Sequence, residues 1–426
     1  MPPAGRPAAN RSTSISVVQV HKRLVIYVQG YDPRGLAEYY RMFRREFRRT
    51  CDLYGLSGKI GRIEDDAERS TASWNVTTNG DGWQVETRYL FLRWEDIIRK
   101  DFGRPPWWKI VHMYRAIGAS IFNGSVTRLI KAHWRFGLFA VYPIVLMTLW
   151  LFLGAFVGTL CMKLVAGLGA PPLVANIVGM VTGLGAFSSA LWLTEPRTYL
   201  LYLCDDIIST RQFALGRRPD WEKRMDSFAG TVIAAVRDSK ADEAIVVGHS
   251  SGSFLAIDVL DRALARDPQL GKHGPRVRLL TIGANLPIVG FQPEAKWFRN
   301  RLRRLAVAPD IDWVDFQSRH DIMNFAPFDP VTGHDIVLED DERRNPRVVA
   351  VSFRDLMKDN FGRRRWRFFR THFQFLHANE RLGAAYDYYL ICCGPTDLVT
   401  RAGEPETTIA AITPKRGPEP DPAANL

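Results

Sequence analysis

At 426 residues the chain is long enough to bury a full core and to carry insertions. Its formal net charge of +12 favours anionic partners such as lipid head groups, nucleic acid or acidic substrates. The five cysteines are scattered and include no CxxC pair, which argues against a disulfide framework or a zinc site and favours a reducing compartment. Residues 1–14 lack an apolar core, so we expect a disordered N-terminus and no cleavable secretion signal.

The N-terminal part of the chain, residues 15–105, alternates strand-like and helix-like patterns. Residues 24–28 form an apolar run that predicts a buried strand, and a glycine-containing turn follows it. Residues 36–54 have a helical pattern, with basic side chains interleaved among aromatic ones. Further strands are expected at residues 60–63, 73–77 and 83–94, with a turn at residues 79–82.

Residues 106–200 contain the least polar part of the sequence. Neither residues 136–162 nor residues 164–194 contain a charge. About 20 apolar residues, at ~1.5 Å each, cross the ~30 Å hydrocarbon core of a bilayer. We therefore expect two transmembrane helices, at about 136–162 and 172–194, preceded by an amphipathic stretch along the interface. The alternative is a buried hairpin of a soluble protein, although globular helices rarely run so long without a charge. Candidate interfacial anchors are Trp134, Trp150 and Trp192.

Each of the two expected helices contains a GxxxG motif. In an antiparallel hairpin that turns near Gly169, Gly154 lies opposite Gly183, and Gly158 lies opposite Gly179. Small residues at matching depth allow two helix backbones to approach closely. The sequence therefore predicts that the helices pack along these glycines.

The basic residues around the hairpin indicate its orientation. Arginines and lysines lie before the first helix and after the second, whereas the connecting turn offers only Lys163. By the positive-inside rule both flanks are cytoplasmic, which predicts a two-pass protein of the inner or plasma membrane. The two flanks, residues 15–105 and 201–395, then share one compartment and can build one domain. The flanking basic residues are Arg128, Lys131, Arg135, Arg197, Arg211, Arg217 and Arg218.

The pentapeptide of Gly248, His249, Ser250, Ser251 and Gly252 is the motif that carries chemistry. An apolar strand-like run precedes it, and a helix-like pattern follows it. Strand, tight turn and helix is the geometry of a nucleophile elbow, in which the glycines permit a sharp turn and the serine is exposed. The alternative is a structural turn without a catalytic role.

This motif resembles the nucleophile elbow of the α/β-hydrolase superfamily. A helix at residues 226–239 and strands at 277–282 and 313–317 continue the alternation, which predicts an α/β fold: a mostly parallel sheet with helices on both faces. The transmembrane hairpin is then an insertion in that domain. The resemblance covers roughly residues 20–100 and 200–390, and it is specific at the elbow and loose elsewhere.

The resemblance implies a triad in the chain order Ser, Asp, His. Ser250 would be the nucleophile, Asp321 the acid that follows a late strand, and His372 the base. Other acids in range are Asp315, Asp329 and Asp335, and other candidate bases are His377, His334 and His320, whereas His273 lies too early. His249 is expected to shape the turn.

The resemblance also implies an oxyanion hole made of two backbone amides. One would come from Ser251 and the other from Tyr31 or Gly30, in the turn after the first strand. The family reads His-Gly at that turn, and Gln29 replaces the histidine here. No cofactor is expected, and the neighbours His320-Asp321 and His334-Asp335 match no spaced metal motif.

Residues 363–370 interleave arginine with aromatic residues directly before His372. Such a run can stack on nucleic-acid bases, lie on an anionic membrane surface or form a solvated helix face. With an expected membrane anchor in the same chain, we favour contact with anionic lipids and expect no nucleic-acid partner. Residues 396–426 are expected to form a disordered tail.

Together these features predict a membrane-anchored serine hydrolase that cleaves carboxylic esters, with lipid or other apolar acyl esters as substrates. Two alternatives stay open at this point. One is a non-catalytic membrane protein that uses a hydrolase-like scaffold for binding or assembly, and the other is an acyltransferase with the same triad. The sequence predicts no particular protein partner.

Overall fold

The body of the protein is built on a mixed, mostly parallel sheet of nine strands, in the order β2-β4-β5-β1-β6-β7-β8-β9, with β3 paired to β4. The computed structural model describes residues 19–339, 341–358, 367–404 and 412. From β5 to β9 along this order neighbouring strands are parallel, and the pairs of β4 are antiparallel. The strands are β1 (Lys22–Val28), β2 (Ser57–Ile60), β3 (Glu64–Asp66), β4 (Thr71–Gly80), β5 (Trp83–Leu92), β6 (Glu243–His249), β7 (Arg276–Ile282), β8 (Asp312–Gln317) and β9 (Arg347–Ala350).

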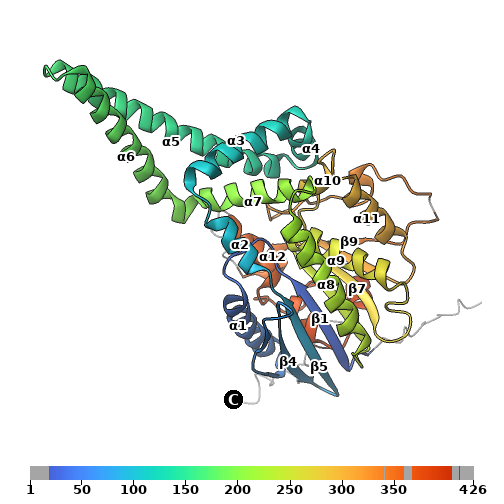
Figure 1. Ribbon diagram of the computed structural model, residues 1–426. Coiled ribbons are helices and arrows are strands. Elements are labelled where there is room, and N and C mark those ends of the chain that lie inside the picture. Colours follow the sequence, from blue (N-terminus) through green and yellow to red (C-terminus); the bar gives the residue numbers. More distant parts are fainter. Residues whose placement is uncertain (1–18, 340, 359–366, 405–411, 413–426) are drawn as a thin grey trace, which may run out of the picture.

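Helices cover both faces of this sheet, so the predicted α/β class is confirmed (Figure 1). Alternate side chains of one strand enter different cores, as Ile26 and Tyr27 show. One core includes residues of α2 (Glu95–Phe102), α8 (Pro219–Arg237), α9 (Gly252–Arg266) and α11 (Lys296–Val307). The other includes residues of α1 (Leu36–Tyr54), α12 (Phe353–Leu356), α15 (Tyr388–Cys393) and α16 (Leu398–Gly403).

Local sequence places most of the predicted elements correctly, with one clear miss. The turn between β4 and β5 has Asp81 and Gly82 at its tip, and Gly82 has a φ of 74° that glycine adopts without strain. The strand predicted at residues 60–63 is wrong, because β2 ends at Ile60 and residues 61–63 lie between β2 and β3. The Gly61 amide donates to the carbonyl of Asn75 at 2.7 Å in this short connection. The short edge strand β9 was not predicted.

Two long apolar helices form a hairpin that projects away from the body (Figure 1). They are α5 (Trp134–Gly167) and α6 (Pro172–Thr198), and each is long and apolar enough to cross a membrane. Both extend beyond the predicted bounds at one or both ends. Most of their apolar surface is exposed. In the most apolar 18-residue stretch of each helix, only 17% of α5 and 11% of α6 is buried. A hairpin buried in a soluble core does not fit this exposure.

The two helices of the hairpin meet along the predicted glycines. A Cβ atom added to Gly154 would lie 2.8 Å from the Gly183 carbonyl oxygen, and one added to Gly158 would lie 2.5 Å from that of Gly179. Real Cβ atoms do not approach so closely, so only glycine permits this spacing. The pairing at matching depth is confirmed.

Three helices lie between the hairpin and the body, namely α3 (Pro106–Phe122), α4 (Ser125–Ala132) and α7 (Leu200–Ala214) (Figure 1). Met113 of α3, Met147 of α5 and Cys204 of α7 are buried together in one apolar cluster. The base of the hairpin is therefore packed onto the protein rather than joined to it by a free linker.

The C-terminal segment is anchored by buried ion pairs, which corrects the tail prediction. Asp397 pairs with Arg278 at 2.6 Å, and the Leu398 amide donates to Glu243 at 2.9 Å. Arg23 pairs with the same glutamate at 2.7 Å. Disorder from residue 396 is therefore wrong for residues 396–404, which include α16. The rest of the predicted tail, apart from Ile412, and the predicted disordered residues 1–14 lie outside the described residues.

Candidate active site

Ser250 lies at the carboxyl end of β6, in the turn before α9. Its φ is 58°, in the left-handed region, and its side chain is half-buried. A Cβ atom on Gly248 would lie 2.5 Å from the Gly252 carbonyl oxygen, and one on Gly252 would lie 2.2 Å from that of Val28. Both glycines are therefore required by close backbone contact. The arrangement of strand, strained turn and helix that the sequence predicts is present.

Asp321 and His372 form a buried hydrogen-bonded pair. His372 Nδ1 lies 2.6 Å from Asp321 Oδ2, and both side chains are fully buried. The second carboxylate oxygen accepts the Met323 amide at 3.0 Å, which fixes the carboxylate within its loop after β8. His372 ends α14 (Phe368–His372), and its Nε2 has no hydrogen-bond partner among the described residues. The pair thus leaves one imidazole nitrogen free.

The imidazole of His372 lies beside the elbow. A Cβ atom on Gly283 would lie 3.2 Å from His372 Cε1, which adjoins Nε2. The residue before that glycine, Ile282, accepts the Ser250 amide at 3.2 Å. The ring of His249 is centred 4.7 Å from the ring of His372. The structure therefore brings Ser250, Asp321 and His372 to one edge of the sheet, at the carboxyl ends of β6, β7 and β8.

The turn after β1 packs against the elbow. A Cβ atom on Gly30 would lie 3.2 Å from Ser250 Cβ and 3.6 Å from the Ser251 nitrogen. Within the described residues, no acceptor is found for the amides of Ser251 and Tyr31. Two free amides beside a serine are the components of an oxyanion hole.

Hydrogen bonds of Tyr31 hold this turn in place. Its hydroxyl donates to Asp101 at 2.9 Å, and Arg218 and Ser209 donate to the same carboxylate oxygen at 2.9 and 3.0 Å. Its backbone carbonyl accepts a hydrogen bond from the Tyr202 hydroxyl. The Trp94 indole N–H donates to the Gln29 carbonyl in the same turn at 3.1 Å.

His249 is unsuited to carry a proton. Burial, together with the neighbouring His372, holds the pKa of His249 well below its usual value. Its Nε2 lies 3.3 Å from the carbonyl oxygen of His372, so the two residues support each other's position. This placement agrees with a role in shaping the turn.

The other candidate acids lie in different surroundings. Asp315 is buried in β8 and accepts the Thr281 hydroxyl at 2.6 Å, and burial raises its pKa to about 6. Asp329 accepts the Val331 amide at 2.8 Å, which ties it to its own loop. Asp335 is exposed.

The other histidines lie in different surroundings. His320 stacks on Phe353, with ring centroids 6.3 Å apart, and His273 is exposed. His334 is buried, its Nδ1 lies 2.7 Å from the Pro330 carbonyl oxygen, and burial lowers its pKa to about 4. His377 lines a cavity described below. Throughout the described ranges, no group of three or more His, Cys, Asp or Glu side chains is placed to hold a metal ion.

A narrow apolar cavity lies between the foot of the hairpin and the loops that follow β7 and β8. This apolar cavity has a volume of about 80 Å³, and α5 supplies Phe136, Phe139, Ala140 and Val141 to its wall. Met323 and Asn285 close it on the side of the β8 and β7 loops, and Asp206 of α7 also lines it. Ser250 does not line this cavity.

Asp206 was not singled out from the sequence. Burial raises its pKa to about 7, and this carboxyl is electrostatically coupled to His372. Its Oδ1 accepts the Thr210 hydroxyl at 3.1 Å. Nothing in its local sequence distinguishes it from its neighbour Asp205, because only the fold brings α7 near the histidine.

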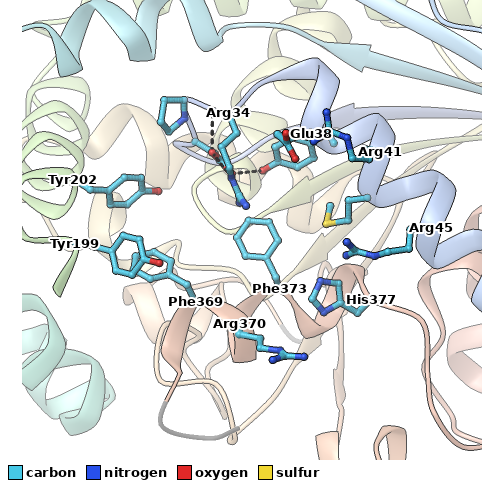
Figure 2. Close-up of a pocket in the computed structure, with 14 residues that line it drawn as sticks. Arg34, Glu38, Arg41, Arg45, Tyr199, Tyr202, Phe369, Arg370, Phe373 and His377 are labelled. Atoms are coloured by element: carbon cyan, nitrogen blue, oxygen red, sulfur yellow. Dashed lines mark hydrogen bonds and ion pairs between the residues drawn. The ribbon is translucent and has the colours of Figure 1, made fainter. Parts of the chain in front are cut away.

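A larger cavity of about 500 Å³ lies near the elbow, and we call it the arginine cavity (Figure 2). None of the three proposed triad residues lines it, but Asp32 and Phe373 do. The ring of Phe373 is centred 5.3 Å from that of His249. Its other main lining residues are Arg34, Glu38, Arg41, Arg45, Tyr199, Tyr202, Phe369, Arg370 and His377.

The end of the predicted basic and aromatic run contacts both helices of the hairpin. Phe368 and Phe139 of α5 have ring centroids 5.9 Å apart, and Phe369 and Tyr199, which follows α6, have ring centroids 4.5 Å apart. Residues 363–366 of the run lie outside the described residues. Comparisons with protein families, with curated proteins and with solved structures found no match to this chain.

Proposed function

We propose that this protein is a serine hydrolase of the α/β-hydrolase type that cleaves carboxylic esters. The observation that carries the proposal is the buried 2.6 Å contact between His372 Nδ1 and Asp321 Oδ2, next to a strained Ser250. The order Ser, Asp, His along the chain and the elbow between β6 and α9 support the superfamily assignment. Gln29 departs from the usual pattern of the superfamily, which has histidine at this turn.

In the proposed reaction Ser250 Oγ attacks the ester carbonyl carbon while His372 Nε2 takes the hydroxyl proton. Asp321 fixes the imidazole tautomer and stabilises the imidazolium. The amides of Ser251 and of Tyr31 or Gly30 donate to the oxyanion; losing one such donor typically costs about 3 kcal/mol of barrier. The C–O bond to the alcohol then breaks, and the imidazolium protonates the departing alkoxide. Water, deprotonated by His372, releases the acid from the acyl-enzyme and restores Ser250.

The hairpin of α5 and α6 supports attachment to a membrane, with the body on the cytoplasmic side. Its outward surface is apolar along its length; Phe152, Met180 and Trp192 are 69%, 69% and 76% exposed. Such a surface is stable in lipid and unfavourable in water. The basic residues flanking the hairpin support the orientation.

The apolar cavity supports an apolar acyl group as substrate. Its walls combine α5 with the loop that carries Asp321, so an apolar space of about 80 Å³ lies between the hairpin foot and the proposed catalytic edge. Lipid esters and other apolar acyl esters both need an apolar site for the acyl group.

The test is active-site labelling with a fluorophosphonate probe. Full-length protein in membranes should be labelled, and the S250A variant should not, because the probe reacts only with an activated serine. Replacing either proposed partner, in H372A or D321A, should slow labelling strongly. The S227A variant, which changes an exposed serine of α8, should be labelled like the unchanged protein. Absence of labelling in folded protein, with folding checked by circular dichroism, would favour a non-catalytic scaffold.

A further inference from the structure

The arginine cavity has two chemically different sides (Figure 2). Aromatic rings line the side nearest the hairpin, where Phe369 packs on Tyr199 and Tyr202 with ring centroids 4.5 and 5.4 Å away. The opposite side carries Arg41 and Arg45 of α1, with Arg370 from α14. A ligand that fills the cavity therefore needs both an apolar and a charged part.

The charges of the lining residues do not balance. Four arginines face two carboxylates, Asp32 and Glu38, which leaves a formal charge of +2. His377 adds nothing near neutral pH, because burial lowers its pKa to about 4. The cavity therefore favours an anion.

Three of the four arginines already have a carboxylate partner, and Arg41 pairs with Glu38. Arg34 is matched by Asp32, which it contacts at 2.6 Å, and it stacks over Phe373. Arg45 shares the carboxylate of Glu46 with Arg49, at 2.6 and 3.0 Å.

Arg370 has no ion-pair partner within the described part of the chain, and it is exposed. Its guanidinium is therefore available to an incoming anion in a cavity that Arg41 and Arg45 of α1 also line (Figure 2). Arginine clusters of this kind are typical of phosphate recognition, because a phosphate offers three oxygens to several guanidinium groups.

The cavity also adjoins the proposed catalytic centre. Phe373 directly follows His372, and Asp32 lies two residues after Gly30. The apolar cavity adjoins the same centre, because Met323, whose amide donates to Asp321, lines it. An ester bond held at Ser250 would thus lie near an apolar space and near a cationic one.

We propose that the arginine cavity binds the phosphate group of an acyl ester, so that the substrate class is a phosphate-bearing amphiphile. This inference rests on the proposed esterase function and makes it more specific. A lipid head group and the phosphate of a soluble acyl ester share the same chemistry. The volume of about 500 Å³ is that of a site for a small ligand rather than for a macromolecule.

The experiment compares esters that differ only in the phosphate. Full-length protein in neutral detergent micelles is assayed with 1-oleoyl lysophosphatidic acid and with 1-oleoyl glycerol. The R370Q variant, and a second variant combining R41Q with R45Q, should lower kcat/KM for the phosphate ester about tenfold and leave that for the neutral ester unchanged. Matched controls are R367Q and R48Q, which change exposed arginines next to α14 and on α1 that do not line the cavity. These controls should leave both rates unchanged.

A parallel pair, butyryl glycerol phosphate and monobutyrin, identifies the source of the phosphate. If R370Q lowers kcat/KM for the phosphate ester only in the long-chain pair, the phosphate is that of a lipid head group. If the loss is equal in the short-chain pair, the substrate is a soluble ester. Equal losses for phosphate and neutral esters, or no loss for either, would overturn the proposed site.

Binding to the S250A variant separates this proposal from the esterase function. Titration calorimetry should show tighter binding of lysophosphatidic acid than of 1-oleoyl glycerol, weakened about tenfold by adding R370Q. If the unchanged protein hydrolyses neither ester, the proposed reaction is wrong. The titration then still shows whether the arginine cavity binds the phosphate group. Equal affinities for the two lipids would overturn the proposed site.

Discussion

Ser250 occupies a left-handed conformation that residues with a side chain rarely adopt, with a φ of 58°. A conformation of this kind costs of order 1 kcal/mol and persists only where the surroundings enforce it. Here Gly248 and Gly252 provide that enforcement, because the chain on either side of the serine is in backbone contact with itself and with β1. Strain at a half-buried hydroxyl, beside a histidine with one free nitrogen, is the combination that supports a nucleophile.

The residue scale also yields a prediction for pH dependence. Burial raises the pKa of Asp206 to about 7, so this carboxyl loses its proton close to neutral pH. The resulting negative charge favours the protonated imidazolium of His372, which cannot accept the Ser250 proton. In D206N this charge is absent, so the neutral imidazole persists at lower pH. The acid limb of kcat/KM should move to lower pH.

The measurement is the pH profile of ester hydrolysis between pH 5 and pH 9 for D206N and for a control. D238N changes an exposed aspartate at the end of α8 and should leave the profile in place. A shift of the limb toward higher pH in D206N would contradict the sign of the coupling.

At the element scale, the hairpin depends on glycines that have no room for a side chain. A Cβ atom on Gly158 would meet the Gly179 carbonyl oxygen at 2.5 Å, whereas nothing lies within 4 Å of one on Gly185 of the same hairpin. The G158L variant should therefore be destabilised by about 1–3 kcal/mol through overpacking. G185L should unfold like the unchanged protein.

Thermal unfolding of the detergent-purified protein measures this difference. If both leucine variants melt at the same temperature, the two helices do not pack along their glycines in detergent, and the close spacing would have to be abandoned.

The elements that the sequence predicts well are those whose signal is local. The uncharged stretches of the hairpin and the spacing of Gly154 and Gly158 need no knowledge of the rest of the fold. The elbow at Ser250 is likewise contained within a few residues. Asp321 and His372 are 51 positions apart and were paired through resemblance to a family, not through periodicity.

What the sequence did not predict depends on distant residues coming together. The arginine cavity combines Arg41 of α1 with Arg370 of α14, and no local pattern joins two such segments. Residues 396–404 belong to the predicted disordered tail, yet Arg278 and Glu243 hold Asp397 and Leu398 by charges that belong to β7 and β6. Composition cannot indicate a buried partner elsewhere in the chain.

At the scale of the whole molecule, the hairpin contacts both loops that supply the proposed catalytic groups. Phe136 of α5 packs on Phe325 in the loop of Asp321, with ring centroids 4.3 Å apart. Phe139 of the same helix contacts Phe368, at the start of the short helix that ends at His372. The proposed acid and base are therefore both supported by the foot of one helix.

This support predicts that F368A lowers the rate of the chemical step. Loss of the ring contact, worth about 0.5–1.5 kcal/mol, would loosen the helix that carries His372 and reduce the fraction of well-placed imidazole. Because Phe368 lines neither cavity, kcat and the rate of fluorophosphonate labelling should fall severalfold while KM stays unchanged. The control is F152A. The ring of Phe152 on α5 is 69% exposed, so its removal should change neither rate. Equal rates for F368A and the unchanged protein would mean that the hairpin anchors the chain without positioning its histidine.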